Sequence, residues 1–108
     1  MDEWARKGAT LSDKSAGEEF GLTQDQIEDA IRAGKLEYRP ASMHGNPWLR
    51  LLRRDVEDLV RTTRGEQYLE QRLARAELSR VDRELKRLRA QLAELEQRRS
   101  MLAVQLEG

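Results

Sequence analysis

The sequence predicts a mainly α-helical protein with one small β-hairpin and a long C-terminal helix. Three observations lead to this prediction. Two short helices with clear capping residues lie in the first third of the chain. From Gly34 to Leu52, apolar and polar residues alternate around a turn that holds Gly, Asn and Pro. Beyond Gly65, apolar residues recur at the spacing of a helix that pairs with another helix.

Two helices are predicted before the hairpin, and their ends are marked by capping residues. Ser12 is the predicted N-cap of the first helix, which runs to about Phe20 and ends at Gly21. Thr23 and Gln26 have the spacing of a capping box and predict the start of the second helix. Because only two residues separate the helices, we expect a helix-turn-helix.

The predicted hairpin has two short strands. Leu36 and Tyr38 alternate with charged residues, and we expect this first strand to stop at Pro40, which lacks a backbone donor. Residues Ser42 to Pro47 are predicted to form the turn. Trp48 to Leu52 forms the second strand. A third helix follows near Asp55, and its predicted inner face consists of Val56, Leu59 and Val60.

The C-terminal part carries a heptad pattern, and residues 62–65 before it are predicted to form a loop or a bend. Apolar residues at alternating steps of three and four form the predicted oligomerisation seam: Leu78, Val81, Leu85, Leu88, Leu92, Leu95, Leu102 and Leu106. Arg99 fills the one missing position, and Leu69 and Leu73 fall outside this register. A long helix with a single apolar seam needs another helix to cover it.

The charges on the predicted coiled coil leave its direction open. In a parallel pair, Glu84 meets Arg89 favourably, but Glu77 meets Asp82 unfavourably. An antiparallel pair centred near Gln91 brings Glu84 towards Arg98. We expect self-association, most simply as a homodimer, or pairing with another coiled-coil protein.

Charged side chains are unevenly distributed along the sequence. The net charge of the 108-residue chain is +0, but the charge is segregated. Residues 1–34 have four basic and eight acidic side chains, a balance of −4. Residues 35–64 have seven and four, a balance of +3, and residues 65–108 have nine and eight, a balance of +1. The basic part is therefore the middle third.

Residue types and segments that the sequence lacks indicate where the protein acts and which chemistry it does not perform. There are no cysteines, no run of about 18 apolar residues and no signal-peptide pattern. We therefore expect a cytoplasmic protein that does not enter a membrane. His44, the only histidine, has no neighbouring ligand set or nucleophile, so it is predicted to be a surface turn residue. We expect no metal, no cofactor and no enzymatic activity.

Residues 11–59 resemble a known family of small domains. The matching residues are Ala16-x-x-x-Phe20-Gly21-Leu22-Thr23, then Gly34-Lys35-Leu36, Trp48-Leu49-Arg50 and Asp55-Val56-Glu57. This layout resembles the winged helix-turn-helix DNA-binding domains of the MerR-regulator and excisionase type and, more distantly, the helical DNA-binding part of the XPA repair protein. The resemblance implies a hairpin wing, DNA binding and, as in MerR-type regulators, a dimerising coiled coil after the domain.

With this resemblance, the sequence divides into three parts. Residues 1–10 are predicted to be a flexible N-terminus, in which Trp4 could still pack on the domain. Residues 11–64 form the predicted winged helix-turn-helix domain, and residues 65–108 form the coiled-coil oligomerisation helix.

Polar and basic residues around the predicted wing are the candidate DNA contacts: Gln24, Lys35, Arg39, His44, Asn46, Arg50, Arg53 and Arg54. The arginines and the lysine would bind phosphates, while His44 or Asn46 would reach a minor-groove edge and Gln24 an adenine. The alternative is a solvated basic face, in which Arg53 and Arg54 pair with nearby carboxylates. Tyr38 and Trp48 are expected to pack the hairpin onto the helices rather than to stack on bases.

Two functions follow from this interpretation. The first is DNA binding by a coiled-coil homodimer, as in transcription regulation or DNA architecture. The second is a protein-interaction or assembly module, in which the winged domain no longer binds DNA. The start of the second helix favours the second function, because Asp25, Glu28 and Asp29 would repel phosphates.

Overall fold

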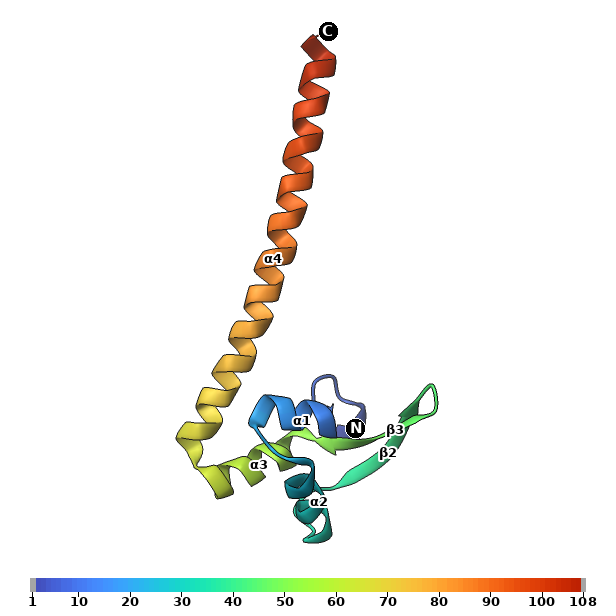
Figure 1. Ribbon diagram of the computed structural model, residues 1–108, viewed down its shortest axis with the longest axis vertical. Coiled ribbons are helices and arrows are strands. Elements are labelled where there is room, and N and C mark those ends of the chain that lie inside the picture. The colour runs from blue at the N-terminus through green and yellow to red at the C-terminus, as the bar shows by residue number, and fades with distance from the viewer. Residues whose placement is uncertain (1, 108) are drawn as a thin grey trace. The chain divides into compact units, whose positions relative to one another are not determined.

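The computed structural model describes residues 2–107, and it forms two compact units that divide after Ala74. The protein is mainly helical, with a small antiparallel sheet and a long C-terminal helix, as the sequence predicts (Figure 1). The elements in chain order are η1 (Glu3–Ala5), β1 (Thr10–Ser12), α1 (Asp13–Phe20), α2 (Gln24–Arg32), β2 (Tyr38–Met43), β3 (Asn46–Leu52), α3 (Arg53–Arg64) and α4 (Glu66–Glu107).

The predicted caps of the first two helices are confirmed. The Ser12 hydroxyl accepts a hydrogen bond from the Ser15 amide at 3.0 Å, so α1 begins one residue later, at Asp13. α1 ends at Gly21, whose φ of 71° lies in the left-handed region that glycine tolerates. Thr23 and Gln26 form the complete capping box, with bonds of 3.1 and 2.9 Å. Local sequence thus fixes both ends of the inter-helix turn.

The start of α4 satisfies the last carbonyl groups of α1. The Tyr68 hydroxyl donates to the Phe20 carbonyl at 2.9 Å. The Arg72 guanidinium donates to the carbonyls of Glu18 and Glu19, each at 2.9 Å. The last carbonyls of a helix lack partners within the helix, so these side chains fix α1 to the first turns of α4.

The sheet has three strands in the order β1–β3–β2. It has one strand more than the predicted hairpin, because β1 was not predicted. The predicted end of the first hairpin strand at Pro40 is wrong. β2 runs through Pro40, which lies opposite Leu49, and the turn contains only His44 and Gly45. Proline is tolerated here because β2 is an edge strand. Both turn residues have positive φ, 53° and 83°, as in the type I′ turns that close tight hairpins.

One apolar core holds the first unit together. Its buried members come from β1, α1, α2, β3, α3, the start of α4 and the segments that flank α2, but not from β2: Leu11, Ala16, Phe20, Leu22, Ile27, Ala30, Leu36, Leu51, Val56, Leu59, Val60 and Leu69. Leu69, which does not fit the heptad register, is buried in this core, and Leu73 packs against it. The first unit therefore continues past the predicted boundary at residue 64, and the first turns of α4 belong to it.

The N-terminal residues differ from the predicted flexible segment. Residues 3–5 form η1, and Trp4 is only 7% exposed. The Asp2 carboxylate caps η1 by accepting from the Trp4 amide at 3.1 Å. The Ala9 carbonyl accepts from the Arg53 amide at 2.8 Å, and β1 begins at the next residue. A buried tryptophan anchors this segment to the domain.

The second unit is the remainder of α4, from Arg75 onwards. The side chains of the predicted seam lie on its surface and are between 40% (Leu85) and 88% (Leu106) exposed. Ion pairs three residues apart, Glu77–Arg80 and Glu84–Arg87, lie on this helix. The unit has an apolar stripe but no core of its own within the described residues.

Candidate nucleic-acid interface

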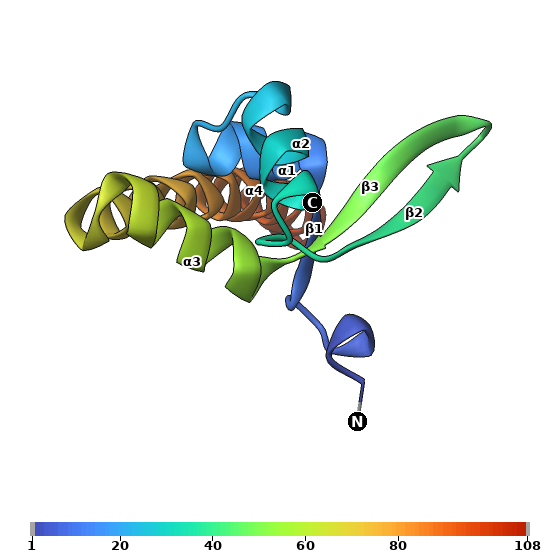
Figure 2. The same ribbon diagram turned by 90° about the horizontal axis from the view of Figure 1, so that it is seen from below.

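The outer part of the hairpin, residues 40–49, forms an arm without Asp, Glu, Lys or Arg. The arm extends beyond β1, which pairs only with the last residues of β3, and it projects away from the helices (Figures 1 and 2). His44, Asn46 and Met43 are exposed on it. Tyr38, just before the arm, is half exposed, contrary to the expected packing, while Trp48 is partly buried.

Arg39 and Arg50 lie opposite each other at the base of the arm. Two like charges in such a cross-strand pair are unfavourable, and the N-terminal residues offset them. The guanidinium carbons lie 4.4 Å (Arg39) and 5.8 Å (Arg50) from the centre of the Trp4 ring. Arg50 also donates to the Trp4 carbonyl and to the Thr10 hydroxyl. Arg39 pairs with Asp2 at 3.5 Å. Arg50 is therefore a structural residue, and Arg39 keeps an exposed guanidinium.

Arg53 is engaged inside the domain. Its two terminal nitrogens donate to the two carboxylate oxygens of Glu19 at 2.8 and 3.2 Å, which joins α3 to α1. The side chains are only 30% and 14% exposed. The hydrogen bond to Glu19 raises the pKa of Arg53 above its usual value, against the opposing effect of burial. A phosphate would have to displace this bidentate pair, so we remove Arg53 from the candidate contacts.

Arg54 stays at the surface. Its guanidinium pairs with Glu3 at 3.1 Å and approaches Asp55 at 3.7 Å. It borders a small pocket of about 180 Å³, which is also lined by Glu3, Arg6, Gly8, Ala9, Arg53 and Glu57. Arg54 and Arg39 are thus the two candidate arginines that reach solvent, and each touches an acidic residue of the N-terminal segment.

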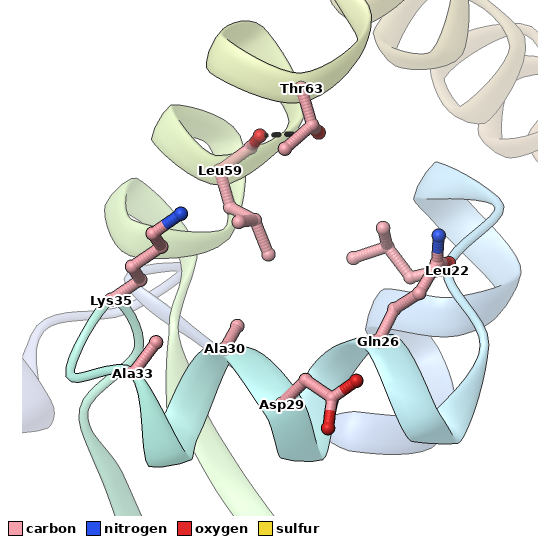
Figure 3. Close-up of a pocket in the computed structure, with 8 residues that line it drawn as sticks. All are labelled: Leu22, Gln26, Asp29, Ala30, Ala33, Lys35, Leu59 and Thr63. Carbon is pink, nitrogen blue, oxygen red and sulfur yellow. Dashed lines mark hydrogen bonds between the residues drawn. The ribbon is translucent and has the colours of Figure 1, made fainter.

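Lys35 lies away from the arm, whereas Gln24 is linked to it through Asp13, whose carboxylate also accepts from the Leu49 amide at 3.3 Å. Lys35 borders a pocket of about 290 Å³ between α2 and α3, where Leu22 and Leu59 face each other (Figure 3). The Gln24 amide donates to the Asp13 carboxylate at 3.1 Å, which occupies part of its hydrogen-bonding capacity. The structure therefore does not gather the eight predicted DNA contacts into one continuous patch.

The exposed surface of α2 is acidic. Asp25, Glu28 and Asp29 are all exposed, and within residues 2–107 only Asp29 of these three pairs with a cation, Arg32 of the same helix. A helix in the major groove lies close to two phosphate backbones, so these carboxylates oppose deep insertion of α2.

Sequence reasoning missed the contacts of the N-terminal residues with Arg39, Arg50 and Arg54. The only signal was Trp4, a large aromatic within an acidic start, next to a middle third with a balance of +3. The partners are separated by 37 to 51 residues, so no local pattern pairs them.

Comparisons with known proteins found no match: no family model, no curated protein and no solved structure matches this chain. Among residues 2–107, no three His, Asp or Glu side chains are grouped in a way that could hold a metal ion. Across the same residues, no helix has the length and apolar character needed to cross a membrane. The contacts and surfaces described above carry the functional proposal.

Proposed function

We propose that the first unit is a winged helix-turn-helix domain and that the protein binds duplex DNA as a coiled-coil homodimer. The observation that carries this proposal is the projecting arm, which stands beside a capped helix pair and has two exposed arginines near its base. An uncharged hairpin flanked by cations suits a groove between phosphate backbones, because the cations bind phosphates while the arm enters the groove.

The internal contacts of Arg50 and Arg53 reduce the number of residues that we propose to contact DNA. Arg39 and Arg54 bind phosphates, and His44 and Asn46 at the tip of the arm reach base edges in the minor groove. Lys35 adds a phosphate contact from the side of α2. Arg50 and Arg53 position the arm and α3 through their internal contacts and do not bind DNA directly.

The proposed dimer follows from the exposed seam of the second unit. Leucines at most a and d positions of about four heptads form a stripe that another helix covers, and a second copy of the chain supplies the same stripe. A homodimer then presents two arms to DNA, and the coil sets the spacing of the two half-sites.

The experiment compares duplex-DNA binding by the full chain and by the double variant Arg39→Gln, Arg54→Gln. We expect the variant to bind at least about tenfold more weakly and to lose about 0.9 from the log–log salt slope for each lost phosphate contact. The matched control is Arg80→Gln, Arg87→Gln, which removes the same charge from exposed ion pairs on α4. Equal effects of the two variants would contradict a specific role for the arginines near the arm.

A second candidate, a protein-interaction or assembly module, is favoured by the acidic surface of α2. In this case Asp25, Glu28 and Asp29 bind a basic partner, and the coil joins copies of the chain or pairs with another coiled-coil protein. The variant Asp25→Asn, Glu28→Gln, Asp29→Asn separates the two functions. It strengthens DNA binding under the first proposal, because repulsion is removed, and abolishes partner binding under the second.

A further inference from the structure

We infer that Asp2 and Glu3 occupy the places of two DNA phosphates, so that the N-terminal segment, residues 2–6, competes with DNA for Arg39 and Arg54. This inference rests on the proposed function and adds an intramolecular competitor to it. It assigns a role to the acidic residues at the start of the chain, which otherwise have no part in the proposed interface.

The first occupied place lies at the base of the arm. One carboxylate oxygen of Asp2 accepts from the Trp4 amide at 3.1 Å, and the other lies 3.5 Å from the Arg39 guanidinium. The same guanidinium stacks on the Trp4 ring at 4.4 Å. Arg39 thus binds an anion on an aromatic platform, the arrangement in which an arginine also binds a backbone phosphate.

The second occupied place is the small pocket at the start of α3. Glu3 lies 3.1 Å from Arg54 there, and Arg6 and Arg53 line the same pocket. Glu57, which also lines the pocket, lies 4.0 Å from Arg53, but Arg53 is already held by Glu19, and Arg54 has a second, longer contact with Asp55 at 3.7 Å. Neutralisation of Glu3 removes the shorter of the two contacts of Arg54 and one negative charge from the lining of the pocket, while the longer contact with Asp55 remains.

The exposure of the two pairs makes the competition reversible. The side chains are 51% and 55% exposed in the Arg39–Asp2 pair, and 61% and 27% exposed in the Arg54–Glu3 pair. Exposed ion pairs contribute little to stability, so phosphates can replace the two carboxylates at low cost. Trp4 is buried and anchors the segment. The carboxylates are therefore tethered beside the arginines and compete at a high effective concentration.

The test measures duplex-DNA affinity of the full-length double variant Asp2→Asn, Glu3→Gln. Asparagine keeps the N-cap acceptor for the Trp4 amide, and glutamine keeps the shape of Glu3, so the fold is preserved. We expect binding about three- to tenfold tighter than that of the wild type at low salt, because two weak competitors are removed. We expect the salt slope to steepen by up to about 0.9 for each freed arginine.

The control Glu70→Gln, Glu94→Gln makes the same change in net charge on exposed positions of α4 and is expected to alter affinity less than twofold. An equal gain in both variants would show a general charge effect and overturn the inference. Unchanged affinity in Asp2→Asn, Glu3→Gln, together with loss of binding in Arg39→Gln, Arg54→Gln, would overturn the inference while the proposed function stands. Absence of binding in every variant would overturn both.

Discussion

The two units of this protein differ in how their apolar side chains are buried. In the first unit, the apolar residues lie in one core, and most of the arginines near the arm are held by contacts within the unit. In the second unit, the leucines lie exposed along one helix. The first unit therefore buries its apolar side chains within one chain, whereas the second leaves an apolar stripe exposed, which the proposed homodimer would cover.

The largest effect is expected for substitutions in the apolar seam of the second unit. Replacement of two seam leucines, Leu88→Lys and Leu95→Lys, places charges where a partner helix packs in the proposed dimer. We expect self-association to weaken by more than about 100-fold, because each buried leucine contributes about 1.5–3 kcal/mol and each buried charge adds a penalty. Sedimentation equilibrium measures the association, and circular dichroism follows the helix content.

The matched control places the same charges on the opposite face of the coil, as Ala90→Lys and Gln97→Lys. These residues lie away from the seam in the heptad register, so the control is expected to associate like the wild type. A wild-type chain that stays monomeric at high concentration would contradict the proposed homodimer.

A smaller effect, on the free energy of unfolding, is expected for substitutions at the junction of α1 with α4. A Cβ at Gly21 would lie 2.7 Å from the Tyr68 hydroxyl, whereas a Cβ at Gly34 would meet nothing within 4 Å. Both glycines have positive φ, so Gly34→Ala is expected to cost about 1 kcal/mol of backbone strain. Gly21→Ala adds the lost Tyr68 hydrogen bond and is expected to cost about 2 kcal/mol.

Chemical denaturation of the two variants gives this difference in the free energy of unfolding. A third variant, Tyr68→Phe, removes the hydroxyl that the new Cβ meets. In that background the cost of Gly21→Ala should fall towards that of Gly34→Ala, with the contact of the new Cβ with Arg72 at 3.4 Å remaining. If Gly21→Ala and Gly34→Ala cost the same in the wild-type chain, the contact between Tyr68 and α1 does not contribute to stability.

The smallest effect concerns the pH dependence of the second unit. The hydrogen bond from Arg87 lowers the pKa of Glu84 below its usual value of 4.5, so the folded helix favours the charged carboxylate. Its stabilising contribution is present above the usual pKa and is lost as the pH falls through the lowered pKa. Glu84→Gln is therefore expected to lower the melting temperature by about 1–2 °C at pH 7 and to have no such effect at strongly acidic pH.

The control for this variant is Glu94→Gln, which removes the same charge from another exposed position of α4. Thermal melts by circular dichroism at both pH values distinguish the two variants. A destabilisation by Glu84→Gln that persists at acidic pH would contradict the assignment to the ion pair with Arg87.

Local patterns in the sequence were sufficient to predict the helices of the first unit. Ser12, Thr23 and Gln26 act through backbone groups three residues away, and Gly21 acts at its own backbone, so nearby residues determine these caps. The heptad pattern likewise predicted the exposed seam, because helix periodicity alone places those leucines on one face.

The candidate site could be predicted only in part, because its arginines are controlled by distant residues. The pairing of Arg53 with Glu19 and of Arg54 with Glu3 depends on how α3 packs, which no local pattern encodes. The short strand β1 gave no signal, since only pairing with β3 defines it. The extent of β2 was predicted wrongly because proline ends most strands, whereas an edge strand accepts it.

The measurement that tests the central proposal most directly is a titration of short duplex DNA with three full-length proteins at low and near-physiological salt. These are the wild type, the seam variant Leu88→Lys, Leu95→Lys, and the variant Arg39→Gln, Arg54→Gln. We predict binding by the wild type that falls steeply with salt, weaker binding with about half the salt slope for the seam variant, and the weakest binding for the arginine variant. Absence of wild-type binding at low salt would contradict the proposal and favour the acidic surface of α2 as the binding site for a protein partner.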